Sequence, residues 1–391
     1  MRIRLAAALA AAAVVAVLAA DRIRGTPPVE PAAAVASAAD RALRGPALGR
    51  SEFASLIARI SEPGGFFDTD NLISNESSYL HVIGKLEERG VHGGAYIGVG
   101  PDQNFSYIAR IRPAIAFIID IRRDNLLQHL WFKALFELAP TRIEYLSLMM
   151  GRAPPARPAR WEDASIDALI DEVSKQSVDA ESLADARRRV LEAVAGFGVP
   201  LSAADLATIA SIHQRFALAG FGLQFTSYGR APRPFYPTYG ALLLETDLQG
   251  RQVSYLAGEA DYRFVRDLER RNLVIPVVGD LAGPKALVTI GDVLRERDTG
   301  LSGLYVSNVE FYLMQDGTFD RFTRNLAALP AQPAALLIRS VFGRFYVHPQ
   351  NVPGYASTQL LQTVASLVDG FEAGRYRTYD DLVYGELVPV R

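Results

Sequence analysis

One stretch of alternating apolar runs constrains what this chain can fold into more than any other feature. Residues 95–100 form a short apolar run that ends in glycines, and residues 114–119 form a second, wholly apolar run that ends at Asp120. Residues 101–111 and 122–138, which follow these runs, carry apolar residues at helical spacing. Continuous apolar strands that alternate with helices are typical of a parallel sheet covered on both faces. The stretch therefore predicts an α/β fold.

The same alternation resumes in the last third of the chain. An apolar run from Leu273 ends at Gly279-Asp280, residues 285–295 have helical spacing, and residues 357–372 are expected to form a further helix. We therefore expect a Rossmann-like, mostly parallel sheet with helices on both faces. Its five parallel strands are expected near residues 94–99, 114–120, 273–279, 303–308 and 334–340.

Between these two parts the alternation stops, which indicates an insertion over residues 145–265. A Pro-rich connector precedes three helical stretches, and Leu242–Thr246 and Gln252–Leu256 flank a polar turn typical of a β-hairpin. We interpret residues 145–265 as a largely helical cap that carries this hairpin, or alternatively as a helical layer with a structural role alone. The α/β domain would then consist of residues 51–144 and 266–391, and the helical stretches lie at about 162–176, 180–196 and 203–219.

The composition excludes several classes of protein. The 41 Lys+Arg and 43 Asp+Glu residues give a net charge of −2, which argues against a nucleic-acid-binding protein. The absence of cysteine excludes disulfides, thiolate metal sites and a cysteine nucleophile. The five histidines show no metal-ligand spacing, so we expect no metal.

The first twenty residues differ from the rest of the chain. Arg2 and Arg4 precede an uncharged run over residues 5–20, the pattern of a signal peptide or a short N-terminal membrane anchor. Residues 21–50 are rich in Ala and Pro and are expected to form a tether. The protein is therefore expected to be exported to the periplasm or beyond, or anchored to the inner membrane by this segment alone.

Candidate site residues follow the glycine-rich run. Glycines such as Gly98 and Gly100 let the backbone turn sharply and approach a ligand at a helix N-terminus, although they can also simply form a tight turn. Asp120 lies twenty residues past Gly100, a spacing that places a carboxylate near ribose hydroxyls, although it can also cap the next helix. Gln103 occupies the third glycine position of the dinucleotide fingerprint, which favours a nucleoside without a diphosphate. The polar stretch around Glu76 needs hydrogen-bonding partners or a ligand, and it can also begin a helix.

On these residues the chain resembles the class I S-adenosylmethionine-dependent methyltransferases. The resemblance rests on the Gly98-x-Gly100 loop, Asp120, the Gly279-Asp280 pair and a loose match over Asn308–Phe311. The chain is also similar to a family of uncharacterised bacterial proteins on that fold, marked by residues 67–76 and 98–104. The resemblance implies S-adenosylmethionine as cofactor, with Gly98 and Gly100 under its methionine portion, Asp120 on its ribose and Asp280 near its adenine. It also implies cofactor contacts from Glu76, Gln103 and Asn104, and an acceptor-facing catalytic group of Asn308, Glu310 and Tyr312.

Two hypotheses follow. The first is an envelope-located methyltransferase of unknown acceptor, which would act mainly by positioning the sulfonium methyl against a nucleophile. The second is a non-catalytic, secreted or envelope binding or scaffold protein on a degenerate version of the fold. Export favours the second hypothesis, because S-adenosylmethionine is a cytoplasmic cofactor. The expected partner is a small nucleoside-type ligand, although in the second hypothesis the pocket can hold another ligand or be empty.

Overall fold

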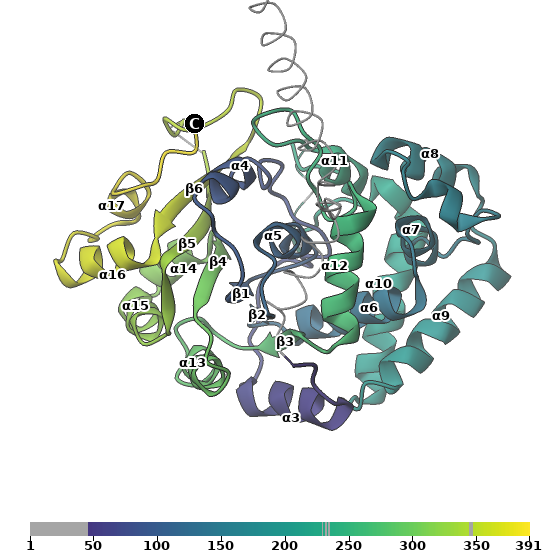
Figure 1. Ribbon diagram of the computed structural model, residues 1–391, viewed down its shortest axis with the longest axis horizontal. Helices are drawn as coiled ribbons and strands as arrows, with labels where there is room; N and C mark the ends of the chain where they lie inside the picture. Colours follow the sequence, from purple (N-terminus) through teal and green to yellow (C-terminus); the bar gives the residue numbers. More distant parts are fainter. Residues whose placement is uncertain (1–45, 229, 231–232, 234, 344–346) are drawn as a thin grey trace, which may run out of the picture. The chain divides into compact units, whose positions relative to one another are not determined.

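The computed structural model describes residues 46–391 except 229, 231, 232, 234 and 344–346. Its central sheet has the strand order β3-β2-β1-β4-β5-β6 (Figure 1). The first five strands in that order are parallel to their neighbours, and β6 is antiparallel to β5. The strands are β1 (Ala95–Gly98), β2 (Ile115–Asp120), β3 (Val274–Val278), β4 (Leu301–Ser307), β5 (Ala331–Phe342) and β6 (Ser357–Thr363). This order confirms the predicted Rossmann-like α/β fold.

The helices were largely predictable from apolar spacing. In the described part of the chain, the first group is α3 (Arg50–Ile60), α4 (Ile83–Glu88), α5 (Gln103–Ile111), α6 (Arg123–Leu138), α7 (Arg142–Met149), α8 (Ile166–Lys175), α9 (Ala180–Ala195) and α10 (Ala203–Ala219). The second group is α11 (Tyr239–Leu244), α12 (Glu259–Arg270), α13 (Ala286–Glu296), α14 (Val309–Gln315), α15 (Phe319–Ala327), α16 (Val364–Glu372) and α17 (Tyr379–Val383). Two short 3-10 turns, Pro158–Trp161 and Gly220–Gly222, complete the set.

The sheet is a buried middle layer. Every residue of β1 and β3 is buried, as the continuous apolar runs predicted. Helices α5 and α6 pack against one face, over β1, β4, β2 and β3, whereas α13, α15 and α16 cover the opposite face (Figure 1). Consecutive parallel strands require such crossover helices, so the alternation in the sequence directly determines the layers.

The predicted hairpin of Leu242–Thr246 and Gln252–Leu256 is wrong. Its first arm is mostly helix α11, which Thr238 caps by accepting a hydrogen bond from the backbone N–H of Ala241. Tyr239, Leu242 and Leu243 are buried at helical rather than alternating spacing. A single antiparallel bridge between Thr246 and Gln252 remains of the expected pairing.

The helix expected over residues 357–372 is also half wrong, because its first seven residues form strand β6. Leu360 and Leu361 are adjacent and both fully buried, on opposite faces of the sheet edge. The strand pairs with β5 from Leu336↔Thr363 to Phe342↔Ser357. Thr363 then caps helix α16, where the helical pattern holds.

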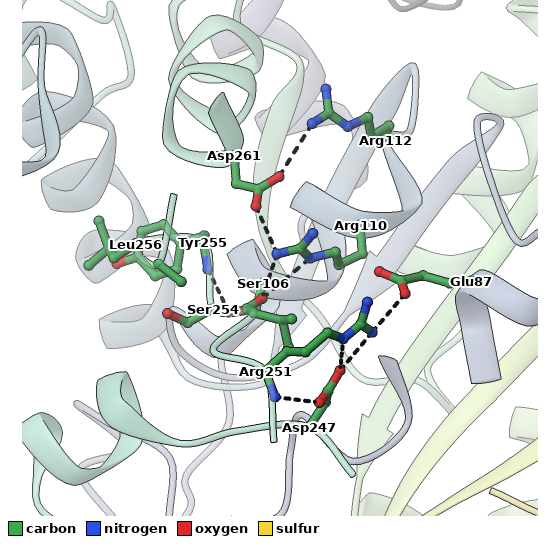
Figure 2. A network of polar contacts seen from close by, with 12 residues as sticks. Glu87, Ser106, Arg110, Arg112, Asp247, Arg251, Ser254, Tyr255, Leu256 and Asp261 are labelled. Atoms are coloured by element: carbon green, nitrogen blue, oxygen red, sulfur yellow. Dashed lines mark hydrogen bonds and ion pairs between the residues drawn. The ribbon is translucent and has the colours of Figure 1, made fainter. Parts of the chain in front are cut away.

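Charged side chains hold the end of the insertion against α5 (Figure 2). Arg110 of α5 forms an ion pair with Asp261 of α12 at 2.8 Å, and Arg112 contacts the same carboxylate at 3.3 Å. Arg251 pairs with Asp247 at 2.7 Å and with Glu87 at 2.8 Å. These bridges orient the insertion on the α/β layers.

The predicted signal or anchor over residues 1–20 and most of the predicted tether lie outside the described residues. From Pro46 onward, apart from the few gaps, no described helix is both long enough and apolar enough to cross a membrane.

Candidate functional site

The glycine-rich turn lies at the switch point of the sheet, where the strand order reverses between β1 and β4. Gly98 pairs with Ile118 of β2 on one side and with Tyr305 of β4 on the other. Asp120 ends β2 two residues beyond Ile118, so it reaches the same carboxyl edge as the turn. Ligands of open α/β sheets bind at such a switch point.

The two glycines are required for different reasons. A Cβ atom at Gly98 would lie 1.9 Å from Asn104 Oδ1 and 2.6 Å from Tyr96 Oη, so the chain's own side chains fill that space. Gly100 instead has φ +83°, and a Cβ there would have only Gln103 Nε2 within 4 Å, at 3.7 Å. Gly100 is itself buried, but its Cβ position is the uncrowded part of the turn.

Asn104 and Gln103, two predicted cofactor contacts, are used differently. Asn104 Nδ2 donates to the carbonyls of Val99 (2.9 Å) and Pro101 (2.7 Å), so this amide holds the turn itself. Gln103 Nε2 donates to Tyr305 Oη at 3.1 Å. Gln103 Oε1 is buried without a hydrogen-bonding partner among the described residues, which leaves one acceptor beside the turn unused.

The Asp120 carboxylate, predicted to bind ribose hydroxyls, is bound by Arg122. Arg122 Nε lies 3.0 Å from Oδ1 and its Nη2 lies 2.7 Å from Oδ2, a bidentate arrangement with both side chains about nine-tenths buried. The backbone N–H of Arg122 also donates to Oδ1 at 2.9 Å. Both carboxylate oxygens therefore already accept hydrogen bonds within the chain.

Residues 62–78, which we call the covering segment, run along the carboxyl edge of the sheet. At one end, the backbone N–H of Glu62 donates to the carbonyl of Val278 at the end of β3. In the middle, Gly65 donates to the carbonyl of Ile121, just past β2. At the other end, Ser78 Oγ contacts Ser357 Oγ of β6 at 2.7 Å. The polar stretch singled out in the sequence is thus the cover of this edge.

Glu76 fixes the far half of the covering segment. Its side chain is buried, and its carboxylate accepts hydrogen bonds from Tyr305 (2.7 Å), Gln359 (2.8 Å) and the hydroxyls of Ser307 and Ser340. These four donors come from β4, β5 and β6. The carboxylate predicted to contact a cofactor therefore joins three strand ends to the covering segment.

Glu310 does not face an open acceptor position in this structure. It is buried on α14 and forms a bidentate ion pair with fully buried Arg339 of β5, at 2.6 and 3.1 Å. Arg339 Nη2 also donates to Gln362 Oε1 at 2.8 Å. Asn308 and Tyr312 remain partly exposed at the exit of β4, and the Tyr312 ring packs edge-on against Phe67 of the covering segment at 5.1 Å.

Asp280 lies at the end of β3, two strands away from the glycine turn in the sheet. It is partly exposed, and its Oδ1 accepts a hydrogen bond from the backbone N–H of Ala282 at 2.8 Å. The structure thus places Gly98, Gly100, Gln103 and Asp120 around one edge position, with Asp280 farther along that edge.

Two buried titratable groups beside the turn had not been singled out as site residues from the sequence. Asp102 accepts hydrogen bonds from Tyr239 (2.9 Å) and Tyr255 (3.1 Å), and burial raises its pKa to about 6. His129 Nε2 lies 2.9 Å from the carbonyl oxygen of Gly100, and burial lowers its pKa to about 4. The ring is therefore neutral at pH 7 and donates to the turn. The two phenols that bind Asp102 come from the insertion, so no local pattern indicated them.

Two cavities of the described residues lie away from the turn. One of about 210 Å³ is lined by residues in and around α7 and α9, including Glu144, Arg152 and Asp185. Another surrounds Tyr376 and Tyr384 near the C-terminus. In the same part of the chain, no group of three or more His, Asp or Glu side chains is arranged to hold a metal ion.

The strand order and the glycine turn at the switch point define this protein as a Rossmann-like α/β protein. The chain belongs to the family described as Domain of unknown function (DUF7790), whose model matches residues 72–195 and 204–380. The match includes all six strands and most of the insertion, so the insertion belongs to the family domain. No curated protein matches the chain. The family description assigns no activity.

Proposed function

We propose that this protein binds a nucleoside-type ligand, S-adenosylmethionine being the first candidate, beside Gly100 at the carboxyl edge of the sheet. The observation that carries the proposal is the turn itself, which lies at the switch point and leaves the Cβ position of Gly100 unoccupied by the chain. Asp120 at the next strand end and the unused acceptor Gln103 Oε1 supply polar groups around it.

Methyl transfer at this site would rest on positioning. A sulfonium carries its own leaving group, so alignment of its methyl with a nucleophile supplies much of the barrier reduction. Asn308, just past β4, and Tyr312, on α14, are partly exposed and are the side chains that would face the acceptor. Glu310 would position Arg339 on β5 rather than contact the acceptor, because its carboxylate is already ion-paired with Arg339.

The test is calorimetry of the full-length chain with S-adenosylmethionine and with its demethylated product, together with Gly100→Ala. A Cβ at Gly100 would occupy the open position, so we expect the variant to lose at least about 10-fold in affinity. Gly374→Ala is the matched control, because Gly374 has φ +68° and no atom within 4 Å of its Cβ position. It carries similar backbone strain away from the site and should bind like the wild type.

A non-catalytic binding or scaffold protein is the second candidate. It is favoured by the fact that Asp120 and Glu310 are each paired with an arginine of the chain. Failure of both ligands to bind or stabilise the wild type at millimolar concentration would reject the first candidate and leave the second.

A further inference from the structure

We propose that Arg122 is an autoinhibitory latch, which holds the first half of the covering segment closed and occupies the carboxylate that a ligand needs. The ligand arm of this inference rests on the proposed function, whereas the latch itself does not. In the closed state the guanidinium of Arg122 contacts both the carboxylate of Asp120 and the covering segment. Moving the guanidinium away would release the segment and Asp120 together.

The geometry of Arg122 carries the first step. Its Nε and Nη2 bind the two oxygens of Asp120, and its Nη1 donates to the carbonyls of Thr69 (3.2 Å) and Asp70 (2.9 Å). The side chain is 8% exposed. Arg122 therefore joins the end of β2 directly to the covering segment.

The second step concerns competition for Asp120. Ribose hydroxyls would need the same two oxygens that Arg122 now holds, because charge-assisted bonds to a carboxylate are the strong contacts available there. A ligand must therefore displace the guanidinium before it gains this contact. The exchange trades one pair of bonds for another, so the latch lowers the apparent affinity without blocking the site permanently.

The third step is that the two halves of the covering segment are held differently. Residues 63–66 are exposed and include Gly64 and Gly65, and Phe66 is 78% exposed. Beyond them, Asp68 and Asp70 pair with Thr226, Tyr228 and Arg230, and Asp70 also pairs with Arg215 of the insertion. The Glu76 half is instead fixed to three strands.

These contacts define the moving part. Residues 63–72 are hydrogen-bonded to residues 226–228, so these two stretches would open as one flap, whereas residues 74–80 would stay in place. Besides Arg122, the hydrogen bonds between residues 63–72 and the sheet side run from Gly65 to Ile121 and from Gln128 to Leu72. Asp70 is also paired with Arg215 of α10, but Arg122 is the cation that binds Asp120 as well.

The experiment compares Arg122→Gln with Arg123→Gln by amide hydrogen exchange of the full-length protein without ligand. Arg123 is the adjacent residue and pairs with Asp205, at 2.7 Å, rather than with Asp120, so it is a matched control. We expect exchange in residues 66–72 to rise at least about 10-fold in Arg122→Gln, with residues 74–80 unchanged. Equal exchange in the two variants would overturn the latch.

Arg122→Lys is a second variant in case Arg122→Gln does not fold. It keeps the positive charge but cannot bind both oxygens of Asp120 and both carbonyls of the covering segment. It should also raise exchange in residues 66–72. The ligand arm then measures S-adenosylhomocysteine by calorimetry, and affinity should rise at least about 10-fold in Arg122→Gln but not in Arg123→Gln. Raised exchange with unchanged affinity would overturn the autoinhibitory role. Raised exchange with no binding by any variant would support the latch and reject the proposed function instead.

Discussion

Asp102 couples the stability of the protein to pH. Its pKa of about 6 lies above the ordinary value of 3.8, so the folded state retains a proton that the unfolded state has already lost. Stability from this group is therefore full below about pH 4 and falls as pH rises to about 6, by on the order of 3 kcal/mol. We expect Asp102→Asn to flatten this part of the pH profile, measured as free energy of unfolding in urea.

The control for this prediction is Asp171→Asn, on the exposed face of α8. It should leave the slope between pH 4 and pH 6 as in the wild type. If Asp102→Asn kept the wild-type slope, the two tyrosines would have to hold Asp102 ionised throughout.

A second prediction concerns the buried pair of Glu310 and Arg339. Glu310→Ala leaves a fully buried guanidinium without its carboxylate, which costs about 3–5 kcal/mol. The double variant Glu310→Met/Arg339→Met should recover most of that loss, because apolar side chains of similar volume replace the pair. Urea denaturation measures both, and a stable Glu310→Ala would show that the pair contributes little.

Sequence spacing predicted the place of Gly98, Gly100 and Asp120 but not the partners of the acids. The spacing works because parallel strands align their carboxyl ends, a constraint that acts along the chain. The pairing of Asp120 with Arg122, and of Glu310 with Arg339, depends on side-chain geometry in a chain rich in arginine. No periodicity encodes such pairs, so the candidate site was predictable in position but not in how its charged side chains are paired.

At the scale of elements, Glu76 determines how firmly the covering segment is held. Glu76→Gln replaces a carboxylate oxygen with an amide that cannot accept hydrogen bonds from the surrounding donors. We expect a loss of about 2 kcal/mol in the free energy of unfolding and faster amide exchange in residues 74–80. Glu88→Gln, at an exposed ion pair with Lys85, should change neither quantity measurably.

Elements were predictable where apolar residues repeat over a long run, as in α6 and α10. They were not predictable where a short apolar run fits both the spacing of a helix and the spacing of a strand. Residues 357–363 were assigned to the helix that follows them because Leu360 and Leu361 suit a helix as well as a strand, and pairing with β5 decided the outcome. In the same way Leu242 and Leu243 fit a strand locally, and burial of Tyr239 beside them selected a helix.

At the scale of the molecule, the insertion and the α/β layers share one aromatic core. Phe136 of α6 lies 5.2 Å from Phe105, 4.6 Å from Tyr145 and 5.4 Å from Tyr262, measured between ring centroids. We therefore expect a single unfolding transition by calorimetry and by near-ultraviolet circular dichroism. Phe136→Ala should lower its midpoint and cost about 3–5 kcal/mol.

A matched surface change, Phe66→Ala, should leave that midpoint nearly unchanged because the side chain is 78% exposed. Two separate transitions in the wild type would show that the insertion unfolds on its own.

The contact between Tyr145 and Tyr262 has a consequence for the history of this architecture. These residues stand where the insertion leaves and rejoins the sheet layers, and their ring centroids are 5.4 Å apart. The insertion therefore leaves and rejoins the sheet layers near one place, so its length can change without any change in the order of the strands. Diversity among proteins of this architecture should therefore concentrate between these two tyrosines, while the strand order stays the same.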